Sequence, residues 1–175
     1  MRHSVPIVAI LLLLVGCPPP ETEIDPEVDP GVVGVERLDP TTMGPDRHIT
    51  YAADEVAWAP GPESLPDGSE VSVLEGDPSE EGIFVMRLRF PADYHFPPHW
   101  HPNFERVTVL EGTFHLGTGS EFDAEATTPL PAGSFTVVPP NTQHFARTNE
   151  TTVIQITSVG PWEINYLDPA DDPRG

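Results

Sequence analysis

Short runs in which apolar and polar residues alternate recur from about residue 49 to residue 167. The clearest run places Phe84, Met86, Leu88 and Phe90 on one side of an extended chain. Side chains alternate between the two faces of a strand, so this pattern predicts a β-strand with one buried face. Further runs of this kind lie at residues 107–109, 114–116, 135–137, 153–156 and 162–166. No segment has the apolar spacing of a helix, so the sequence predicts an all-β protein.

Turn residues separate these runs at regular intervals, with Gly, Pro and Asp as the usual separators. Many short strands within about 120 residues favour a single β-sandwich or jelly-roll barrel. The run at 114–116 follows the run at 107–109 across a turn at Glu111 and Gly112. We therefore expect these two strands to form a hairpin. The globular domain is predicted at residues 49–167, followed by an acidic tail at 168–175.

The first 16 residues have the features of a secretory signal peptide. Arg2 and His3 precede an apolar run that is too short to cross a bilayer, which takes about 20 apolar residues. The run ends in Leu14-Val15-Gly16-Cys17, which resembles the lipobox of bacterial lipoproteins. That resemblance implies cleavage before Cys17 and lipidation of its sulfur. The alternative is an ordinary signal peptide with an incidental cysteine.

Residues 17–48 are rich in proline and acidic residues and lack amphipathic periodicity, which predicts an extended linker between the lipidated cysteine and the barrel. The whole sequence contains no lysine and has a net charge of −20. This charge argues against nucleic acid, and against an anionic lipid surface as the main partner. A lipid on Cys17 would place the barrel outside the cytoplasm, at the cell envelope, on the periplasmic side or at the outer membrane in a Gram-negative host.

The candidate chemistry is concentrated between residues 99 and 105. His99 and His101 are two residues apart, so an extended strand presents both imidazoles to one face. Glu105 follows a bend at Pro102 and can return a carboxylate to the same point. Cys17 is the only cysteine, so nitrogen and oxygen must supply the ligands. Imidazoles with one carboxylate suit one divalent Fe, Mn, Ni, Cu or Zn ion.

These residues resemble the first motif of the cupins, a superfamily of double-stranded β-helix barrels. That motif reads Gly, five residues, His-x-His, three or four residues, Glu, six residues and Gly. His99, His101, Glu105 and Gly112 fit it, whereas Asp93 stands at the leading glycine position. Asp93 suits a turn almost as well as glycine.

The second cupin motif is also present. It reads Gly, five residues, Pro-x-Gly, two residues, His, three residues and Asn. Gly133, Pro139 and His144 fit, while Asn141 replaces the second glycine and Thr148 replaces the final Asn. Asn tolerates a left-handed turn better than other non-glycine residues, so we expect the turn to be kept. The resemblance covers roughly residues 56–166 and looks closest to small single-domain bacterial cupins.

The resemblance implies four metal ligands, His99, His101, Glu105 and His144, and a jelly-roll cupin barrel around them. For the histidines the alternative is a set of ordinary strand residues. For Glu105 the alternative is a carboxylate that supports the ligands or the chemistry without binding the ion. Cupins are often dimers, so a homodimer is the alternative to a monomer.

Other polar and aromatic side chains near the motif receive structural interpretations. We expect His95 to be solvent-exposed rather than a proton relay. Arg87 and Arg89 share one strand face, which is interpreted as a solvated face rather than an anion site. Trp100 and Phe104 are expected to pack in the core or at the barrel edge.

Four protein ligands leave open positions on an ion that often takes six. The sequence therefore suggests a metal-dependent enzyme of the cell envelope, an oxygenase, isomerase or lyase acting on a small polar metabolite. The alternative is a non-enzymatic module that binds a metal or small molecule at the membrane surface. A third hypothesis is an ion that only stabilises the barrel.

Overall fold

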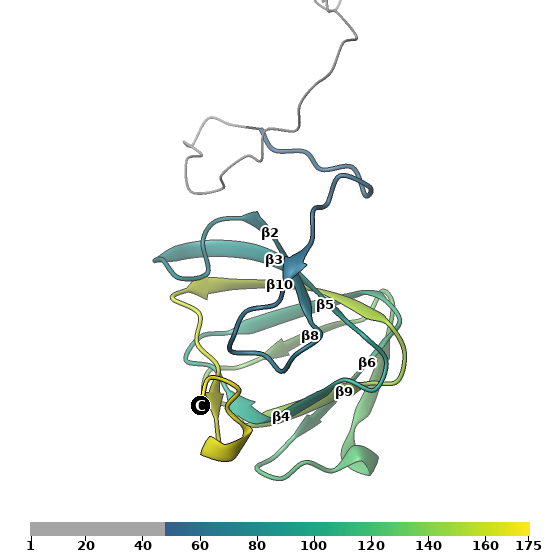
Figure 1. Ribbon diagram of the computed structural model, residues 1–175, viewed down its shortest axis with the longest axis vertical. Coiled ribbons are helices and arrows are strands. Elements are labelled where there is room, and N and C mark those ends of the chain that lie inside the picture. The colour runs from purple at the N-terminus through teal and green to yellow at the C-terminus, as the bar shows by residue number, and fades with distance from the viewer. Residues whose placement is uncertain (1–47) are drawn as a thin grey trace, which may run out of the picture. The chain divides into compact units, whose positions relative to one another are not determined.

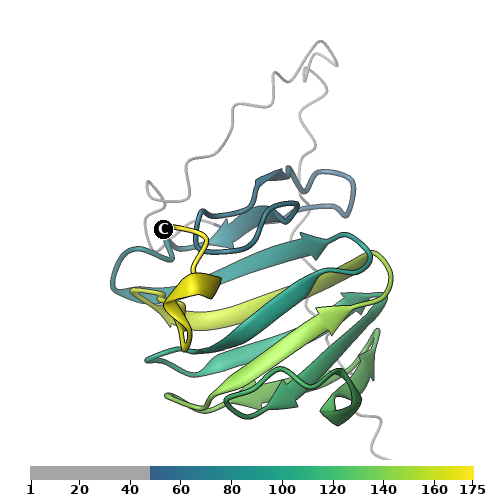
Figure 2. The ribbon, with the colours of Figure 1, turned by 60° about the horizontal axis from the view of Figure 1, so that its bottom comes forward.

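The computed structural model describes residues 48–175, and the strands in this range form two antiparallel sheets. The first sheet has the order β1 (Ala59–Pro60), β2 (Glu70–Glu75), β3 (Gly82–Phe90), β10 (Thr152–Gly160), β5 (Glu105–Glu111) and β8 (Phe135–Val138). The second has the order β11 (Asn165–Tyr166), β4 (His95–Trp100), β9 (His144–Thr148), β6 (Thr113–Thr118) and β7 (Thr128–Pro131). The two sheets face each other across a shared interior (Figures 1 and 2).

Helical structure in the described range is limited to two 3-10 turns, η2 (Ala124–Ala126) and η3 (Pro169–Asp171). Among residues 48–175 no helix has the length and apolar character needed to span a membrane. The prediction of an all-β jelly-roll barrel is therefore confirmed.

The alternating run in β3 supplies the wall of the core. Phe84, Met86, Leu88 and Phe90 are buried, and the residues between them face outward. Ile154 on β10 lies directly opposite Leu88, so the inward faces of the two longest strands coincide. This register places one continuous apolar surface against the second sheet.

Aromatic side chains connect the two sheets. The rings of Phe90 on β3 and Phe96 on β4 meet edge to face with centroids 4.7 Å apart. Phe96 also contacts Phe114 on β6, with centroids 5.7 Å apart. These contacts fill one part of the barrel interior and leave the candidate ligands at its margin.

The expected hairpin between the runs at 107–109 and 114–116 is wrong. β5 pairs with β8 and β10, whereas β6 pairs with β7 and β9 in the other sheet. A single residue, Gly112, joins the two strands, and the common hairpin connections need two or more. Gly112 has φ 69°, and a Cβ there would lie 2.4 Å from the carbonyl oxygen of Thr151. The chain therefore turns a corner between sheets at this residue.

The strand expected at 162–166 is also shorter than predicted, because only Asn165 and Tyr166 pair with β4. The backbone N–H of Trp162 donates instead to the carbonyl oxygen of Pro78 at 2.7 Å. The carbonyl of Glu163 accepts a hydrogen bond from a histidine ring, as described below. The backbone groups of Trp162 and Glu163 therefore form hydrogen bonds at the end of the barrel rather than with a neighbouring strand.

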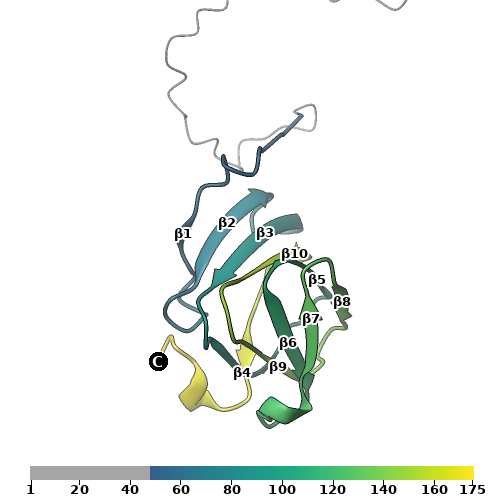
Figure 3. The same cartoon turned by 90° about the vertical axis from the view of Figure 1, so that its right-hand side faces the viewer.

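The turn conformations expected at Asp93 and Asn141 are confirmed. Asp93 has φ 58° and Asn141 has φ 60°, both in the left-handed region that glycine usually occupies. Two non-glycine residues thus keep the backbone path of the two motifs. β4 and β9 follow these two turns, and Figure 3 shows where they lie relative to the loop between β1 and β2 and to the C-terminal segment.

Candidate metal centre

Three strands bring the predicted ligands to one end of the barrel. His99 on β4 and His144 at the start of β9 are directly opposed in the antiparallel pair. His101 lies just beyond the end of β4, and Glu105 is the first residue of β5. All four side chains are buried, with 8% exposure or less. Residues far apart in the chain therefore meet because β4, β9 and β5 begin or end at the same place.

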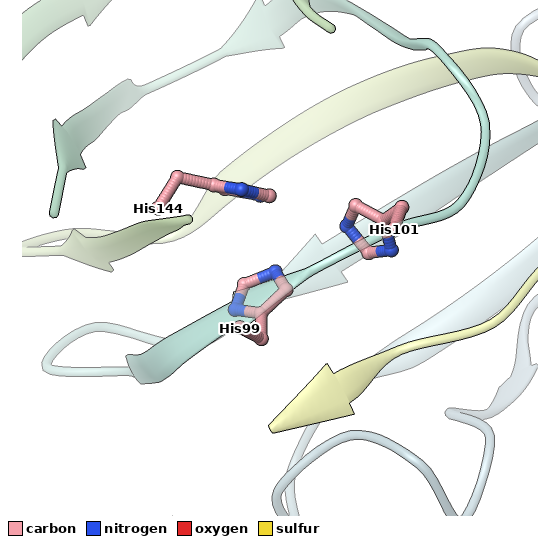
Figure 4. Close-up of side chains that lie close together, drawn as sticks. All are labelled: His99, His101 and His144. Atoms are coloured by element: carbon pink, nitrogen blue, oxygen red, sulfur yellow. The ribbon is translucent and has the colours of Figure 1, made fainter. Parts of the chain in front are cut away.

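The three imidazoles point toward one another (Figure 4). One ring nitrogen from each of His99, His101 and His144 lies within 4.8 Å of the others. The ring centroids of His99 and His144 are 4.2 Å apart, and the other two pairs are 5.0 and 5.2 Å apart. This is a compact group of nitrogen donors rather than a set of separate strand residues.

Backbone carbonyls fix the orientation of all three rings. The Nδ1–H of His99 donates to Pro97 at 2.7 Å, and that of His144 donates to Thr142 at 2.9 Å. The Nδ1–H of His101 donates to Glu163 at 2.7 Å. With Nδ1 used as a donor, each neutral ring keeps its lone pair on Nε2. Hydrogen bonds of this kind orient histidines that bind metals.

The carboxylate of Glu105 lies beside two of the three rings. Its Oε2 is 3.4 Å from Nε2 of His144 and 3.8 Å from Nε2 of His101. The carboxylate is thus placed to join the histidines as a fourth ligand or to interact with them as a neighbour. Both interpretations of Glu105 remain open in this geometry.

Burial and mutual contact determine the protonation of the cluster. Burial, reinforced by His144 and His101, lowers the pKa of His99 to about 3, and burial also lowers the pKa of His101. Burial would raise the pKa of Glu105, but the His144 contact and the other imidazoles lower it to about 2. Burial likewise opposes protonation of His144, yet the Glu105 carboxylate raises its pKa overall. At neutral pH these shifts therefore favour neutral His99 and His101 and an ionised Glu105, and the carboxylate favours the protonated form of His144 when no ion is bound.

A small, largely apolar cavity adjoins the cluster. Its volume is about 30 Å³, which is enough for roughly two water molecules, since one needs about 10–15 Å³. The polar side chains on its wall are the four candidate ligands. Apolar side chains form the rest of the wall and include Leu65, Leu88, Phe96, Phe114, Ile154 and Ile156. Water access to the ligands is therefore limited.

Residues from the chain after β10 complete the site, and the sequence did not indicate this role. The indole of Trp162 stacks on the imidazole of His101, with centroids 4.0 Å apart and planes inclined by 22°. The ring of Tyr166 lies 5.9 Å from that of His99. The carbonyl of Glu163 could not be found from sequence, because every residue carries this group and only the tertiary structure selects one.

The remaining polar and aromatic residues near the motif lie elsewhere. His95 is exposed, as expected, and its ring contacts Phe122 with centroids 5.2 Å apart. Arg87 and Arg89 face outward, where Arg89 pairs with Glu70 at 2.9 Å, so the solvated-face interpretation is confirmed. Trp100 is partly buried at the end of β4.

Phe104 is 45% exposed, and the guanidinium of Arg106 lies over its ring at 5.3 Å. Packing of Phe104 in the core is therefore ruled out, because the residue lies at the outer margin of the barrel. Cys17, the predicted lipidation site, lies outside the residues that the structure describes.

Comparison with known proteins supports the fold. Residues 46–163 match the family model of the ChrR Cupin-like domain. Among proteins with curated descriptions, none matches the sequence. The structure is similar to the polyketide cyclase RemF from Streptomyces resistomycificus, with a TM-score of 0.61 and 17% identity over 73% of this chain and 90% of that one.

Two further solved structures share the barrel. An acetylacetone dioxygenase from Acinetobacter johnsonii gives a TM-score of 0.55 and 17% identity, covering 74% of this chain and 83% of its own. A cupin 2 conserved barrel domain protein from Rhodopseudomonas palustris gives 0.53 and 16%, covering 70% and 87%. At these identities the similarity establishes the fold and leaves the reaction undetermined.

Proposed function

The chain belongs to the ChrR Cupin-like domain family, and on that premise we propose that it binds one divalent metal ion through His99, His101 and His144. The observation that carries the proposal is the convergence of three buried imidazoles whose Nδ1 atoms are already bonded to backbone carbonyls. Glu105 supplies the negative charge beside them, as a fourth ligand or as a neighbour. Such a donor set accepts Fe, Mn, Ni, Cu or Zn.

A ring nitrogen of His101 that has no hydrogen-bond partner supports the binding of an ion at this site. This Nε2 atom is buried and has no hydrogen-bond partner among the described residues. A buried polar atom without a partner costs about 1–3 kcal/mol. A bound cation would satisfy this lone pair, and it would compete with protonation of His144, which the Glu105 carboxylate favours.

We propose further that the bound ion serves the chemistry of a small molecule, as an oxygenase, isomerase or lyase. A divalent ion with open positions polarises an oxygen atom or activates a bound water. The protein holds the donor atoms in place and surrounds them with apolar side chains that limit the access of water. Because the cavity wall has no other charged side chain, recognition falls mainly to the ion, and the rest of the substrate must be small and largely apolar.

One observation favours a second function, a non-enzymatic metal or small-molecule binding module. Every titratable group on the cavity wall is a candidate ligand, so no independent acid or base faces a bound molecule. A metal ion bound at this site would then have a binding or sensing role and would support no turnover. Turnover measurements separate the two functions, whereas ligand substitutions affect both alike.

We also propose that the barrel is held at the outer side of a bacterial membrane by lipidation of Cys17. The support is sequence-based: the apolar run ends at the Leu14–Cys17 lipobox-like segment, and an acidic, proline-rich linker follows. Incorporation of a labelled fatty acid into the native chain, lost in Cys17→Ser, is the expected result. Equal incorporation in the variant would exclude this anchor.

Elemental analysis tests the metal site directly. The full-length chain carrying Cys17→Ser, purified and then dialysed against a single divalent metal, should retain about one equivalent per chain. His144→Ala should retain far less, because it removes one of three converging nitrogens. His95→Ala is the matched control, since His95 is exposed and lies outside the cluster. Equal retention by His144→Ala and the parent would overturn the assignment.

A further inference from the structure

A second, larger cavity lies next to the metal centre. Its walls are the loop of residues 61–69, between β1 and β2, and the C-terminal residues Pro173 and Arg174. Figure 3 shows this loop beside the C-terminal segment. The volume is about 420 Å³, which falls in the range of small-molecule sites, roughly 300–1,000 Å³. We call this cavity the outer pocket and the cavity at the histidines the inner cavity.

Leu65 separates the two cavities. Among the described residues it alone lines both of them, and its side chain is 6% exposed. The inner cavity, with about 30 Å³, admits water but no organic molecule. A ligand that reaches the histidines from the outer pocket must therefore displace the Leu65 side chain.

The loop that carries Leu65 makes few hydrogen bonds to the rest of the barrel, and the packing of Leu65 in the apolar core adds to them. The Tyr166 hydroxyl donates to the carbonyl oxygen of Ser64 at 2.7 Å, and the Tyr94 hydroxyl donates to that of Pro66. A backbone hydrogen bond from Gly61 to Ser69, at 2.8 Å, closes the base of the loop. Segments with few backbone hydrogen bonds open locally at a small free-energy cost.

Both tyrosines remain hydrogen-bond donors at neutral pH. Burial raises the pKa of Tyr94 to about 12, and burial also raises the pKa of Tyr166. Tyr94 directly precedes β4 and its ring packs against Phe96, whereas Tyr166 lies on β11 with its ring beside that of His99. The loop is thus attached to segments next to the metal site, and its opening requires release of both hydroxyls and removal of Leu65 from the core.

The charges around the outer pocket indicate the kind of ligand it takes. Glu63 and Asp67 contribute carboxylates to its wall. The guanidinium of Arg174 is already used, because it donates to Asp172 at 2.7 and 2.8 Å and to the carbonyl oxygen of Ile164 at 2.9 Å. The wall therefore disfavours an anion, and the proposed metal ion would repel a cation, which leaves a neutral molecule.

We propose that the outer pocket is the access site for a small neutral molecule with an oxygen donor, and that Leu65 is the gate between this pocket and the inner cavity. The identity of the ligand rests on the proposed metal function. The role of Leu65 does not, because it follows from the arrangement of the two cavities. Opening moves residues 62–68 as a unit about the Gly61–Ser69 hydrogen bond.

Thiol labelling tests the gate without a metal. The full-length chain with Cys17→Ser and Ala146→Cys has its one thiol on the wall of the inner cavity, at a position that is 1% exposed. Adding Leu65→Ala should speed labelling by the neutral reagent N-ethylmaleimide about tenfold or more, because less buried apolar surface holds the loop closed. Leu88→Ala is the matched control, since Leu88 lines the inner cavity and not the outer pocket.

Equal acceleration by Leu65→Ala and Leu88→Ala would overturn the gate, because labelling would then report loss of global stability. Tyr166→Phe provides a second variant that keeps the ring beside His99 and removes the hydroxyl that holds Ser64. It should raise the labelling rate by a smaller factor than Leu65→Ala. An unchanged rate in both variants would also reject the proposal.

A metal-loaded arm separates this inference from the function on which its ligand rests. Zinc bound to the full-length Cys17→Ser chain should be extracted by EDTA faster in Leu65→Ala than in Leu88→Ala. Failure of the parent chain to bind zinc or any other divalent ion would refute the metal function, and the labelling rates would still decide the gate. Zinc binding with equal extraction rates would count against the gate alone.

Discussion

The backbone N–H of Asn141 donates to the carbonyl oxygen of His101 at 2.8 Å. This hydrogen bond joins the turn of the second motif to a candidate ligand of the first, forty residues earlier in the chain. It forms while Asn141 is in the left-handed conformation with φ 60°. The position of His101 thus depends on a backbone conformation that few residues adopt.

Asn141 should accept glycine and reject a β-branched residue. Asn141→Gly keeps the left-handed turn, so its free energy of unfolding should stay close to that of the parent. Asn141→Val should lower that free energy by about 1–3 kcal/mol, the cost of a strained backbone position. Urea unfolding followed by circular dichroism measures both. Equal stability of the two variants would show that the turn is not needed.

Thr148, which replaces the final Asn of the second motif, anchors the turn at Asp93. Its hydroxyl donates to the carbonyl oxygen of Pro91 at 2.7 Å and accepts from the N–H of Tyr94 at 3.3 Å. Thr148→Val should lower the free energy of unfolding by about 1–3 kcal/mol, because buried polar groups lose their partner. Thr148→Ser keeps the hydroxyl and should lose less.

Thr157→Val serves as the control for this change, because Thr157 lies on the outward face of β10. The same isosteric replacement there should alter stability by no more than about 0.5 kcal/mol. A loss at Thr157 as large as that at Thr148 would assign the effect to strand composition rather than to the Pro91 hydrogen bond. Chemical denaturation allows a direct comparison when the unfolding free energies of the variants fall with denaturant concentration at the same slope.

The sequence predicted those parts of the protein that depend on local spacing. The alternation of Phe84, Met86 and Leu88 predicted a buried strand face, and the period of two carried through to the structure. The shared face of His99 and His101 followed from their spacing, and His144 was added by the resemblance to the second cupin motif. Asp93 and Asn141 were recognised as turn residues because few side chains tolerate left-handed backbone.

The sequence did not predict the features that depend on which strands become neighbours. The pairing of β5 with β8 and β10 rather than with β6 follows from the sheet change at Gly112, which no local pattern marks. The acceptor for His101, the Glu163 carbonyl, is a backbone group supplied by a distant segment. In the sequence, Leu65 is one apolar residue in a proline-rich segment. Only the folded structure shows that it lines two cavities.

Gly112 should tolerate no side chain, for a reason beyond its backbone conformation. Gly112 and Gly133 both have positive φ, 69° and 89°, but a Cβ meets the Thr151 carbonyl only at Gly112. Gly133→Ala should therefore cost about 1 kcal/mol for conformation alone, and Gly112→Ala should cost clearly more. Thermal unfolding of the two variants measures the difference, and a larger loss at Gly133 would contradict the corner described here.

A divalent ion should stabilise the folded barrel through the histidine cluster. Any ligand that binds only the folded state raises stability, by about 2.7 kcal/mol at a free concentration one hundred times its dissociation constant. Zinc added to the full-length chain carrying Cys17→Ser should therefore raise the melting temperature, and a chelator should reverse the shift. His101→Ala should abolish it, because the variant removes one converging nitrogen and the ring that stacks on Trp162.

His115→Ala is the control for this last prediction, because His115 on β6 lies outside the cluster and its ring contacts Asn149 at 3.4 Å. Its melting temperature should rise with zinc as much as that of the parent. Glu105→Gln should give an intermediate shift if the carboxylate binds the ion or orients the ligands, since such partners change affinity by about 10–100-fold. A zinc response in His101→Ala equal to that of His115→Ala would mean that the ion binds elsewhere.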